Sequence, residues 1–331
     1  MRDIIEVEHL VKQFNGLLAI NDVSFGVREG EVFGFLGPNG AGKTTTINIL
    51  CTLLKPTSGR AMLNGFDVSR DQEDVRMSIG LVFQDPSLDI KLSAMQNLEF
   101  HAGVYNMPRS LSRPRIEQML KMVDLWDRRK DTVHTFSGGM RRRLEIARGL
   151  LHHPRVLFLD EPTLGLDPQT RSYIWEHILD IRKQENVTVF LTTHYMDEAT
   201  VADRIAVIDH GKIIALDTPA GLKRMVGGDI ITLTTQAPDA AIEEIGLKHN
   251  IEAHRDAEGV SFEIENGEEF IPTLLSDFKS GLQSISLRRP TLDDVFMKLT
   301  GREIREEAGG VAVMKKHFGI HQTRMGGGRF H

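Results

Sequence analysis

The chain has 331 residues, 40% hydrophobic and 26% charged, which is an ordinary globular composition with room for about two domains. A net charge of −6 argues against a broad nucleic-acid-binding surface, so we expect no nucleic acid among the partners. The charged N-terminus is unlike a secretory signal peptide, and no apolar run approaches the roughly eighteen residues of a membrane span, so we expect a cytosolic chain.

Two β-like stretches open the chain, at residues 4–11 and 19–28. In the second, Ile20, Val23 and Phe25 partly alternate with other residues, as in a half-buried strand. Phe14 lies on the expected connection between the two stretches. We predict a strand pair laid beside the element that follows.

Residues 32–36 predict a buried strand, and the glycine loop after it leads into a helical pattern from Lys43. The spacing of Gly37, Gly42, Lys43 and Thr44 fits a phosphate-binding loop, in which backbone N–H groups surround an anion at the start of a helix. In such a loop Lys43 reaches the β- and γ-phosphates, and the Thr44 hydroxyl ligates Mg²⁺. The alternative is an accidental glycine-rich turn, expected in about one such chain in a hundred.

The apolar run at 79–83 predicts another strand, which ends at Gln84. Apolar residues then recur at helical spacing over 94–127, and Arg113-Pro114 marks the expected start of a second helix. This helical insert, about residues 94–135, interrupts an otherwise α/β pattern. It is either a docking surface for a partner or structural filler, and the residues alone favour neither interpretation.

Ser137-Gly138-Gly139 opens a further helix, with Ser137 as its N-cap. Between the apolar positions of this helix lie Arg141, Arg142, Arg143 and Arg148. Taken alone, the stretch is typical of a capped amphipathic helix with a solvated basic face. Its interpretation changes because of the strand that follows.

That strand, predicted from the apolar run 156–159, delivers Asp160 and Glu161 at its carboxyl end, and a run at 187–191 ends close to His194. In open α/β sheets this is the end where ligands bind. Beside a phosphate loop, Asp160 would hold Mg²⁺ and Glu161 would polarise the attacking water. A lone histidine is usually structural, but here His194 would lie beside the same phosphate.

Past Gly227-Gly228 the pattern restarts in the order βαββαβ, which predicts a small ferredoxin-like domain. Residues 290–296 then begin a closing helix, and 301–331, without periodicity, are expected to be disordered. We therefore predict a nucleotide-binding domain over 1–225, an accessory α+β domain over 226–300 and a tail.

Together these motifs resemble the ATP-binding cassette (ABC) ATPases of membrane transporters over about residues 4–225. The resemblance implies an α/β phosphate-loop NTPase cassette with an antiparallel β subdomain and a helical insert. It assigns nucleotide contacts to Phe14, which would stack on adenine, to Gly37, Pro38, Asn39, Gly40, Ala41, Gly42, Lys43, Thr44 and Thr45, to the signature Ser137, Gly138 and Gly139, and to Asp167. It assigns catalytic roles to Lys43, Gln84, Glu161 and His194, and Mg²⁺ ligation to Thr44, Gln84 and Asp160.

The signature departs from the usual family form, because Phe136 and Met140 replace the Leu and Gln that normally flank Ser-Gly-Gly. The N-cap and both glycines are intact, so we expect function to be retained. This variant, with residues 290–296 and the C-terminal domain, is similar to the daunorubicin-resistance branch of exporters.

The resemblance implies a second copy bound head to tail, so that each signature caps the γ-phosphate held by the other loop and two ATP molecules lie in the interface. Hydrolysis would separate the copies and work a six-helix permease made of separate polypeptides, two per assembly, at the cytoplasmic face of the membrane. The expected cargo is a drug or another amphipathic compound. The alternatives are a soluble ABC ATPase acting on ribosomes or nucleic acid, and a GTP-dependent switch, although the sequence has no Asn-Lys-x-Asp segment.

Overall fold

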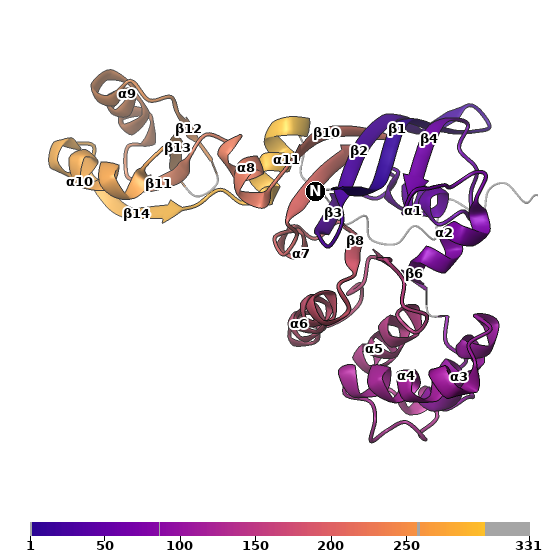
Figure 1. Ribbon diagram of the computed structural model, residues 1–331. Helices are drawn as coiled ribbons and strands as arrows, with labels where there is room; N and C mark the ends of the chain where they lie inside the picture. Colours follow the sequence, from indigo (N-terminus) through magenta and orange to yellow (C-terminus); the bar gives the residue numbers. More distant parts are fainter. Residues whose placement is uncertain (1, 86, 257–258, 302–331) are drawn as a thin grey trace, which may run out of the picture.

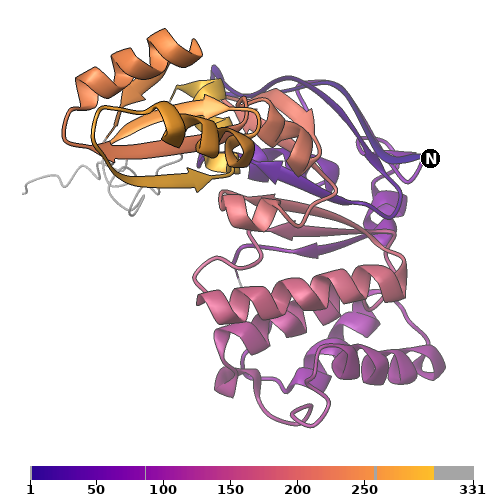
Figure 2. The ribbon, with the colours of Figure 1, turned by 90° about the vertical axis from the view of Figure 1, so that its left-hand side faces the viewer.

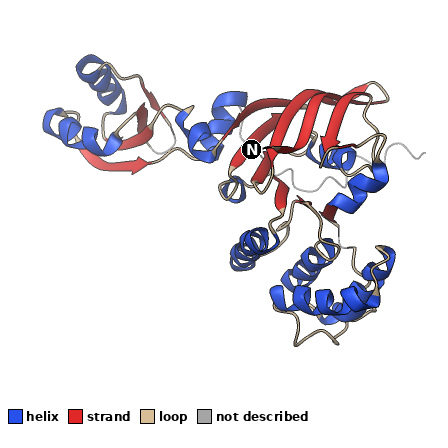
Figure 3. Cartoon of the chain, viewed as in Figure 1, coloured by secondary structure: helices blue, strands red, loops and turns tan. Residues whose placement is uncertain are grey.

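The fold is described from a computed structural model that covers residues 2–85, 87–256 and 259–301. Figure 1 shows two β-rich regions, one at the N-terminal half and one smaller region at the far left, with a group of helices below the first. The colours of Figure 3 separate the helical group from the strands. The predicted tail lies outside the described residues except for Gly301. Within these ranges no helix is both long and apolar enough to cross a bilayer.

The central sheet has six strands in the order β10-β9-β3-β8-β7-β6. In that order the strands are Lys212–Asp217, Arg204–Asp209, Val32–Leu36, Thr188–Thr193, Val156–Asp160 and Ile79–Val82. All pair in parallel except the edge strand β10, and every residue of β3, β7 and β8 is buried. Parallel pairing brings the residues that follow these strands, Gly37, Gln84, Glu161 and His194, to one edge of the sheet.

A second, antiparallel sheet packs on the central one in the order β2-β1-β4-β5. Its strands are Leu17–Arg28, Asp3–Phe14, Ser58–Leu63 and Phe66–Asp67. Phe25 of β2 meets Phe33, Phe35 and Phe190 of the central sheet, with ring centroids 5.5 to 6.1 Å apart. Aromatic pairs at this separation attract one another in addition to burying apolar area, so the two sheets are held in contact.

The connection between β1 and β2 is shorter than the sequence indicated. Asn15 and Gly16 alone form it, with φ of 44° and 89°, as in a two-residue hairpin turn. Phe14 is therefore the last residue of β1, paired with Leu17, and its placement on a connection was wrong.

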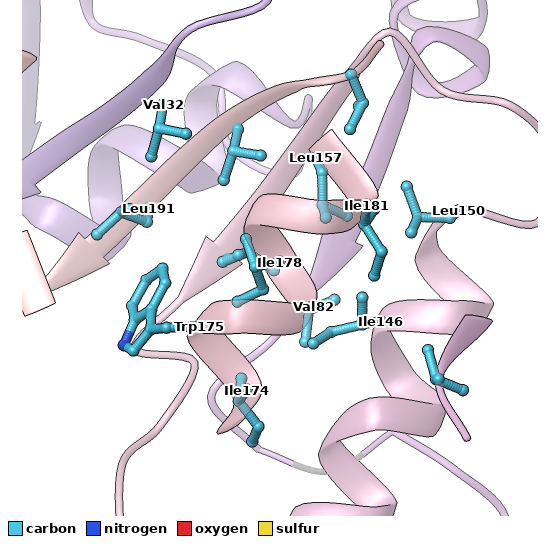
Figure 4. Close-up of a cluster of buried hydrophobic side chains, with 14 of the residues drawn as sticks. Val32, Val82, Ile146, Leu150, Leu157, Ile174, Trp175, Ile178, Ile181 and Leu191 are labelled. Carbon is cyan, nitrogen blue, oxygen red and sulfur yellow. The ribbon is translucent and has the colours of Figure 1, made fainter. Parts of the chain in front are cut away.

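Helices pack against these sheets: α1 (Lys43–Leu50), α2 (Gln72–Ser78), α6 (Pro168–Glu185), α7 (Met196–Ala199) and α8 (Pro219–Arg224). One side of α6 carries four buried apolar residues at helical spacing, Ile174, Trp175, Ile178 and Ile181. Figure 4 shows these side chains gathered with Val32, Leu157 and Leu191 of three neighbouring strands. This cluster fixes α6 beneath the strands that end at the nucleotide edge.

The helical insert, predicted over about residues 94–135, contains α3 (Ala94–Val104), α4 (Arg109–Met122) and a short 3-10 turn (Val133–Thr135), and α5 (Gly138–Gly149) follows it. Figures 1 and 2 show these helices gathered beside α6. The predicted start of the second helix at Arg113-Pro114 was wrong. Pro108 supplies an earlier N-cap, and Pro114 in the second turn removes one backbone donor without ending the helix.

A buried ion pair joins the insert to α6. Arg115 of α4 and Glu185 have side chains only 4% and 9% exposed, with Nη2 and Oε2 2.7 Å apart. The guanidinium also donates to the carbonyl oxygens of Leu150 and Leu151, after the end of α5. Three helices therefore meet at one charged group.

We expect Arg115→Met to lower the free energy of unfolding by about 3–5 kcal/mol, because the buried Glu185 carboxylate would lose its arginine partner and keep only the Gln118 amide and the His153 ring beside it. Lys121→Met is the control, since it removes an exposed pair with Glu117 on the same helix and should cost less than about 1 kcal/mol. Urea unfolding measures both. Equal losses of unfolding free energy in the two variants would show that burial does not make the Arg115–Glu185 pair more stabilising than an exposed pair.

The C-terminal unit confirms the predicted βαββαβ order. Its elements are β11 (Asp229–Thr235), α9 (Pro238–His249), β12 (Ala253–Arg255), β13 (Val260–Ile264), α10 (Gly267–Asp277) and β14 (Leu282–Arg288). The strands form an antiparallel sheet in the order β12-β13-β11-β14, so the first and third strands are central, as in a ferredoxin-like fold. Apolar residues of α9 and α10 share one core with the sheet.

The closing helix α11 (Leu292–Thr300) packs against α7 and α8, and it lies beside α8 in Figure 1. Thr291 and Asp294 form a capping box at its start. Leu292, Val295 and Phe296 are buried in the same apolar cluster as the large core around α6. The motif at 290–296 therefore ties the C-terminal unit to the cassette.

Candidate nucleotide-binding site

The loop after β3 is shaped by glycines that no other residue could replace without movement. Gly42 precedes α1 with φ of 108°, and a Cβ there would lie 2.6 Å from the carbonyl oxygen of Ala19. At Gly37 a Cβ would lie 2.2 Å from the carbonyl oxygen of Ile208. The first N–H groups of α1 have no helical acceptors, so the loop and the helix start together form an anion site.

Lys43 holds a buried ammonium group at this loop. Its Nζ donates to the carbonyl oxygens of Gly37, at 2.7 Å, and Pro38, at 3.1 Å, and lies 3.5 Å from Oε1 of Glu161. Burial lowers the pKa of Lys43, against the attraction of the Glu161 carboxylate. The lysine is thus held in place before any phosphate arrives.

Glu161 lies between this ammonium and a histidine. Its Oε1 is 3.2 Å from Nδ1 of His194 and hydrogen-bonds with it. Burial alone would raise the pKa of Glu161, but the hydrogen bond with His194 and the charge of Lys43 outweigh it and leave the pKa below its ordinary value. Glu161 is therefore ionised at neutral pH, as a group that accepts a proton from water must be.

Asp160 ends β7 beside the first turn of α1. Thr192 donates to its Oδ1 at 2.5 Å, and the Thr44 hydroxyl lies 3.4 Å from the same oxygen. Burial raises the pKa of Asp160, and these two hydrogen bonds offset part of the rise. Among the described residues no group of three or more His, Cys, Asp or Glu side chains could hold a metal ion. Mg²⁺, however, needs only one or two carboxylates when substrate phosphates complete its shell, so Thr44 and Asp160 fit it.

Lys43, Thr44, Glu161 and His194 border a cavity of about 660 Å³. Of the predicted residues, it is lined by Asn39, Gly40, Gly42, Lys43, Thr44, Thr45, Gln84, Glu161 and His194. Five further lining residues were not predicted: Ala19, Leu164, Gly165, Arg171 and Tyr195. Tyr195 directly follows His194, and Leu164 and Gly165 lie shortly after Glu161. Extending the predicted site to the loop residues after Glu161 and His194 would therefore have included all three. No local pattern in the sequence identifies Ala19 or Arg171 as site residues. The Arg171 guanidinium lies 4.2 Å over the Tyr195 ring.

The other predicted residues are not part of that lining, although all lie in the described ranges: Phe14, Gly37, Pro38, Ala41, Ser137, Gly138, Gly139, Asp160 and Asp167. Phe14 is half-exposed, with the Lys12 ammonium 4.8 Å over its ring. Ser137 accepts a hydrogen bond from the Met140 N–H at 3.2 Å, which confirms the predicted N-cap.

Asp167 also acts as a helix cap in this single chain. Its carboxylate accepts hydrogen bonds from the N–H and the hydroxyl of Thr170 at the start of α6. The same contacts lower the pKa of Asp167. In this single chain, therefore, Asp167 and the signature residues lie outside the cavity lining.

A glycine loop at a helix start, a buried lysine and two acidic residues at a strand end define a phosphate-loop nucleotide-binding protein. The family model for ABC transporters matches residues 20–164, and that for the C-terminal domain of ATP-binding proteins like DrrA1-3 matches residues 218–300. The chain belongs to the ABC transporter family, in the branch of the daunorubicin-resistance ATP-binding proteins. The family and fold class predicted from the sequence are confirmed, and the chain is an ATPase.

Similar proteins extend over nearly the whole chain. Daunorubicin resistance ATP-binding protein DrrA3 of Streptomyces coeruleorubidus is 39% identical over 313 residues, 92% of this chain and 98% of that protein. Linearmycin resistance ATP-binding protein LnrL of Bacillus subtilis is 34% identical over 312 residues, 92% of this chain and 100% of that protein.

Solved structures cover the cassette. The cbiO1 protein from Clostridium perfringens, part of the ABC transporter complex cbiONQ, matches with a TM-score of 0.62 and 31% identity over 75% of this chain and 96% of that one. A dimeric post-hydrolysis state of the ATP-binding cassette MJ0796, bound to ADP and Pi, matches with a TM-score of 0.58 and 27% identity over 65% of this chain and 98% of that one.

Proposed function

We propose that this chain is the subunit that binds and hydrolyses ATP to power a separate membrane permease, which exports drugs or other amphipathic compounds. The observation that carries the proposal is that Lys43, Glu161 and His194 meet in one cavity, whereas the signature at Ser137 is exposed outside it. Such a site binds nucleotide alone and needs a second copy to complete it. The drug-resistance names of relatives that align over most of the chain support export.

Each residue has a distinct role in this proposal. The loop N–H groups and the Lys43 ammonium bind the β- and γ-phosphates of ATP. Thr44, Gln84 and Asp160 would hold Mg²⁺, which would supply positive charge beside the phosphates. Glu161 accepts a proton from the attacking water, while His194 holds the Glu161 carboxylate in position. Phe14 stacks on the adenine ring.

The position of the signature residues outside the cavity lining supports a dimer of two copies. The N-terminus of α5, capped by Ser137, is the positive end of the helix dipole, and Ser137 and Gly138 there are exposed. A second copy bound head to tail would bring this end to the γ-phosphate held by the first, with Asp167 at the junction. The dimeric ADP- and phosphate-bound MJ0796 cassette supports the formation of a dimer. Hydrolysis cleaves the shared γ-phosphate, and release of the phosphate then lets the copies separate.

The assembly follows from these roles. We propose a nucleotide-binding domain over 1–225 and an accessory domain over 226–300, with the helical insert as the docking face for the permease. Two copies would engage two permease chains at the cytoplasmic face of the membrane. Separation of the copies would then be passed to the permease as a two-state change.

Co-expression with a candidate six-helix permease tests this function. We expect the chain to sediment with membranes only when the permease is present, and the purified complex to hydrolyse ATP at least about tenfold faster than the chain alone, because the dimer is then favoured by a high local concentration. The matched control is the same preparation without the permease. Recovery of the chain with ribosomes, irrespective of the permease, would favour the ribosomal alternative.

A further inference from the structure

One arginine of the signature helix is not on a solvated face as the sequence suggested. Arg142 of α5 is 7% exposed, and its guanidinium points into the protein. It donates to five acceptors: Nε to Pro162 O, Nη1 to Phe83 O and Glu145 Oε2, and Nη2 to Asp160 O and Glu161 O. An arginine has five N–H donors, so all of them are used. The position of this group is therefore tightly determined.

Glu145, one turn further along α5, completes the arrangement. It is 2% exposed, and its Oε2 accepts from Arg142 at 3.1 Å while its Oε1 accepts from the Ser87 N–H at 2.9 Å. Arg142 and Glu145 thus hold Phe83 on one side of Gln84 and Ser87 on the other. Each charge is buried and neutralised by the other, so neither can be removed without leaving its partner unpaired.

The same guanidinium holds the backbone at Glu161. That residue has φ of 46°, a left-handed conformation that is uncommon for residues other than glycine and persists only where its surroundings fix it. Its N–H donates to the carbonyl oxygen of Thr192 at 3.1 Å, and its carbonyl oxygen accepts from Arg142 at 3.2 Å. One side chain therefore fixes the backbone beside Gln84 and at Glu161, and both residues line the nucleotide cavity.

We propose that Arg142 and Glu145 are positioning residues that hold Gln84 and Glu161 in the relative arrangement needed for ATP hydrolysis. The inference rests on the proposed roles of Gln84 and Glu161. Neither member of the pair lines the cavity, and Lys43 is held by Gly37 and Pro38 instead. Loss of the pair should therefore affect turnover and not ATP binding.

Arg142→Lys tests this, because lysine keeps the charge but has three donors and cannot reproduce the planar fork. In the complex with the permease we expect kcat to fall at least about tenfold, with the KM for ATP within about twofold of the parent value, since misplaced catalytic groups lower the rate of the chemical step. The matched control is Arg143→Lys on the same helix, whose guanidinium donates to the Val123 carbonyl, away from the cavity. Its kcat should stay within about twofold of the parent value.

A parental kcat in Arg142→Lys, or a change in KM alone, would overturn the inference. A merely structural role predicts a lower unfolding temperature with unchanged kcat well below that temperature. If Arg142→Lys does not fold, Glu145→Gln, which keeps an acceptor for Ser87 and removes the buried charge, must lower kcat, and an unchanged value refutes the inference. The parent complex is assayed first: if it hydrolyses no ATP, the proposed function fails, whereas a parent rate shared by the variants refutes the positioning role alone.

Discussion

Glu161→Gln is expected to lower the rate of ATP hydrolysis at least about a hundredfold while leaving ATP binding intact. An amide cannot accept a proton from water at neutral pH, although it has the size of the carboxylate and can still hydrogen-bond with His194. Lys43 keeps its contacts with Gly37 and Pro38, so the phosphate loop should not change shape. Phosphate release measures turnover, and equilibrium titration measures binding. Hydrolysis at the parental rate would show that Glu161 is not the base.

With ATP, the same variant should accumulate as a dimer, because the uncleaved γ-phosphate remains shared between two copies. Size-exclusion chromatography with and without ATP measures this. Adding Gly138→Asp should restore the monomer, since a carboxylate at the start of α5 would repel the phosphate. A Cβ at Gly138 would lie 3.1 Å from the Leu166 side chain, a contact that needs only a small shift. A dimer that persists in the double variant would contradict capping by the signature, and loss of ATP binding by the monomer would indicate misfolding.

The nucleotide edge of the fold could be predicted from the sequence because its signals are local. Fully buried parallel strands appear as continuous apolar runs, and β3, β7 and β8 each have one. The residues after such strands must share an edge, which is why Lys43, Glu161 and His194 could be expected to meet. The cavity lining confirms that they do.

The start of α4 and the end of β1 were mispredicted, because in each case a second local feature decided the boundary. Pro114 is usually a marker of a helix start, but Pro108 precedes it and begins the helix earlier. Phe14 was placed on a connection because the apolar alternation weakens there. The pairing of β1 with β2 nevertheless continues to the two-residue turn at Asn15 and Gly16.

The burial of the Arg142 side chain could not be predicted from the pattern of residues along the sequence. Its position on α5 is that of a basic residue between apolar ones, which in most amphipathic helices means exposure. Its acceptors at Phe83 and Glu161 lie 59 and 19 residues away, and they become neighbours only when the strands of the sheet are assembled. Arg115, which reaches Glu185 over 70 residues, was missed for the same reason. Burial of a charge is decided by tertiary contacts that periodicity does not report.

Lys43→Ala is expected to weaken ATP binding by about a hundredfold or more and to abolish most hydrolysis. A hydrogen bond to a charged group contributes about 1.5–3 kcal/mol, and the ammonium would make such bonds to two phosphates. Part of that gain is offset because Lys43 gives up contacts with Gly37 and Pro38. Titration with ATP measures the loss. Lys121→Ala, on an exposed side chain of α4, is the control and should bind as the parent does.

The same substitution has a second, independent consequence through Glu161. The charge of Lys43 helps to lower the pKa of that carboxyl, so the pKa should rise when the ammonium is removed. Hydrolysis needs the ionised form, and the acid limb of the residual rate should therefore move to higher pH. If ATP binding weakens but the acid limb of the pH–rate profile stays at the same pH, Lys43 binds the phosphates without influencing the pKa of Glu161. Undiminished binding and hydrolysis would contradict the phosphate-loop assignment itself, because no other buried ammonium among the residues lining the cavity could replace Lys43.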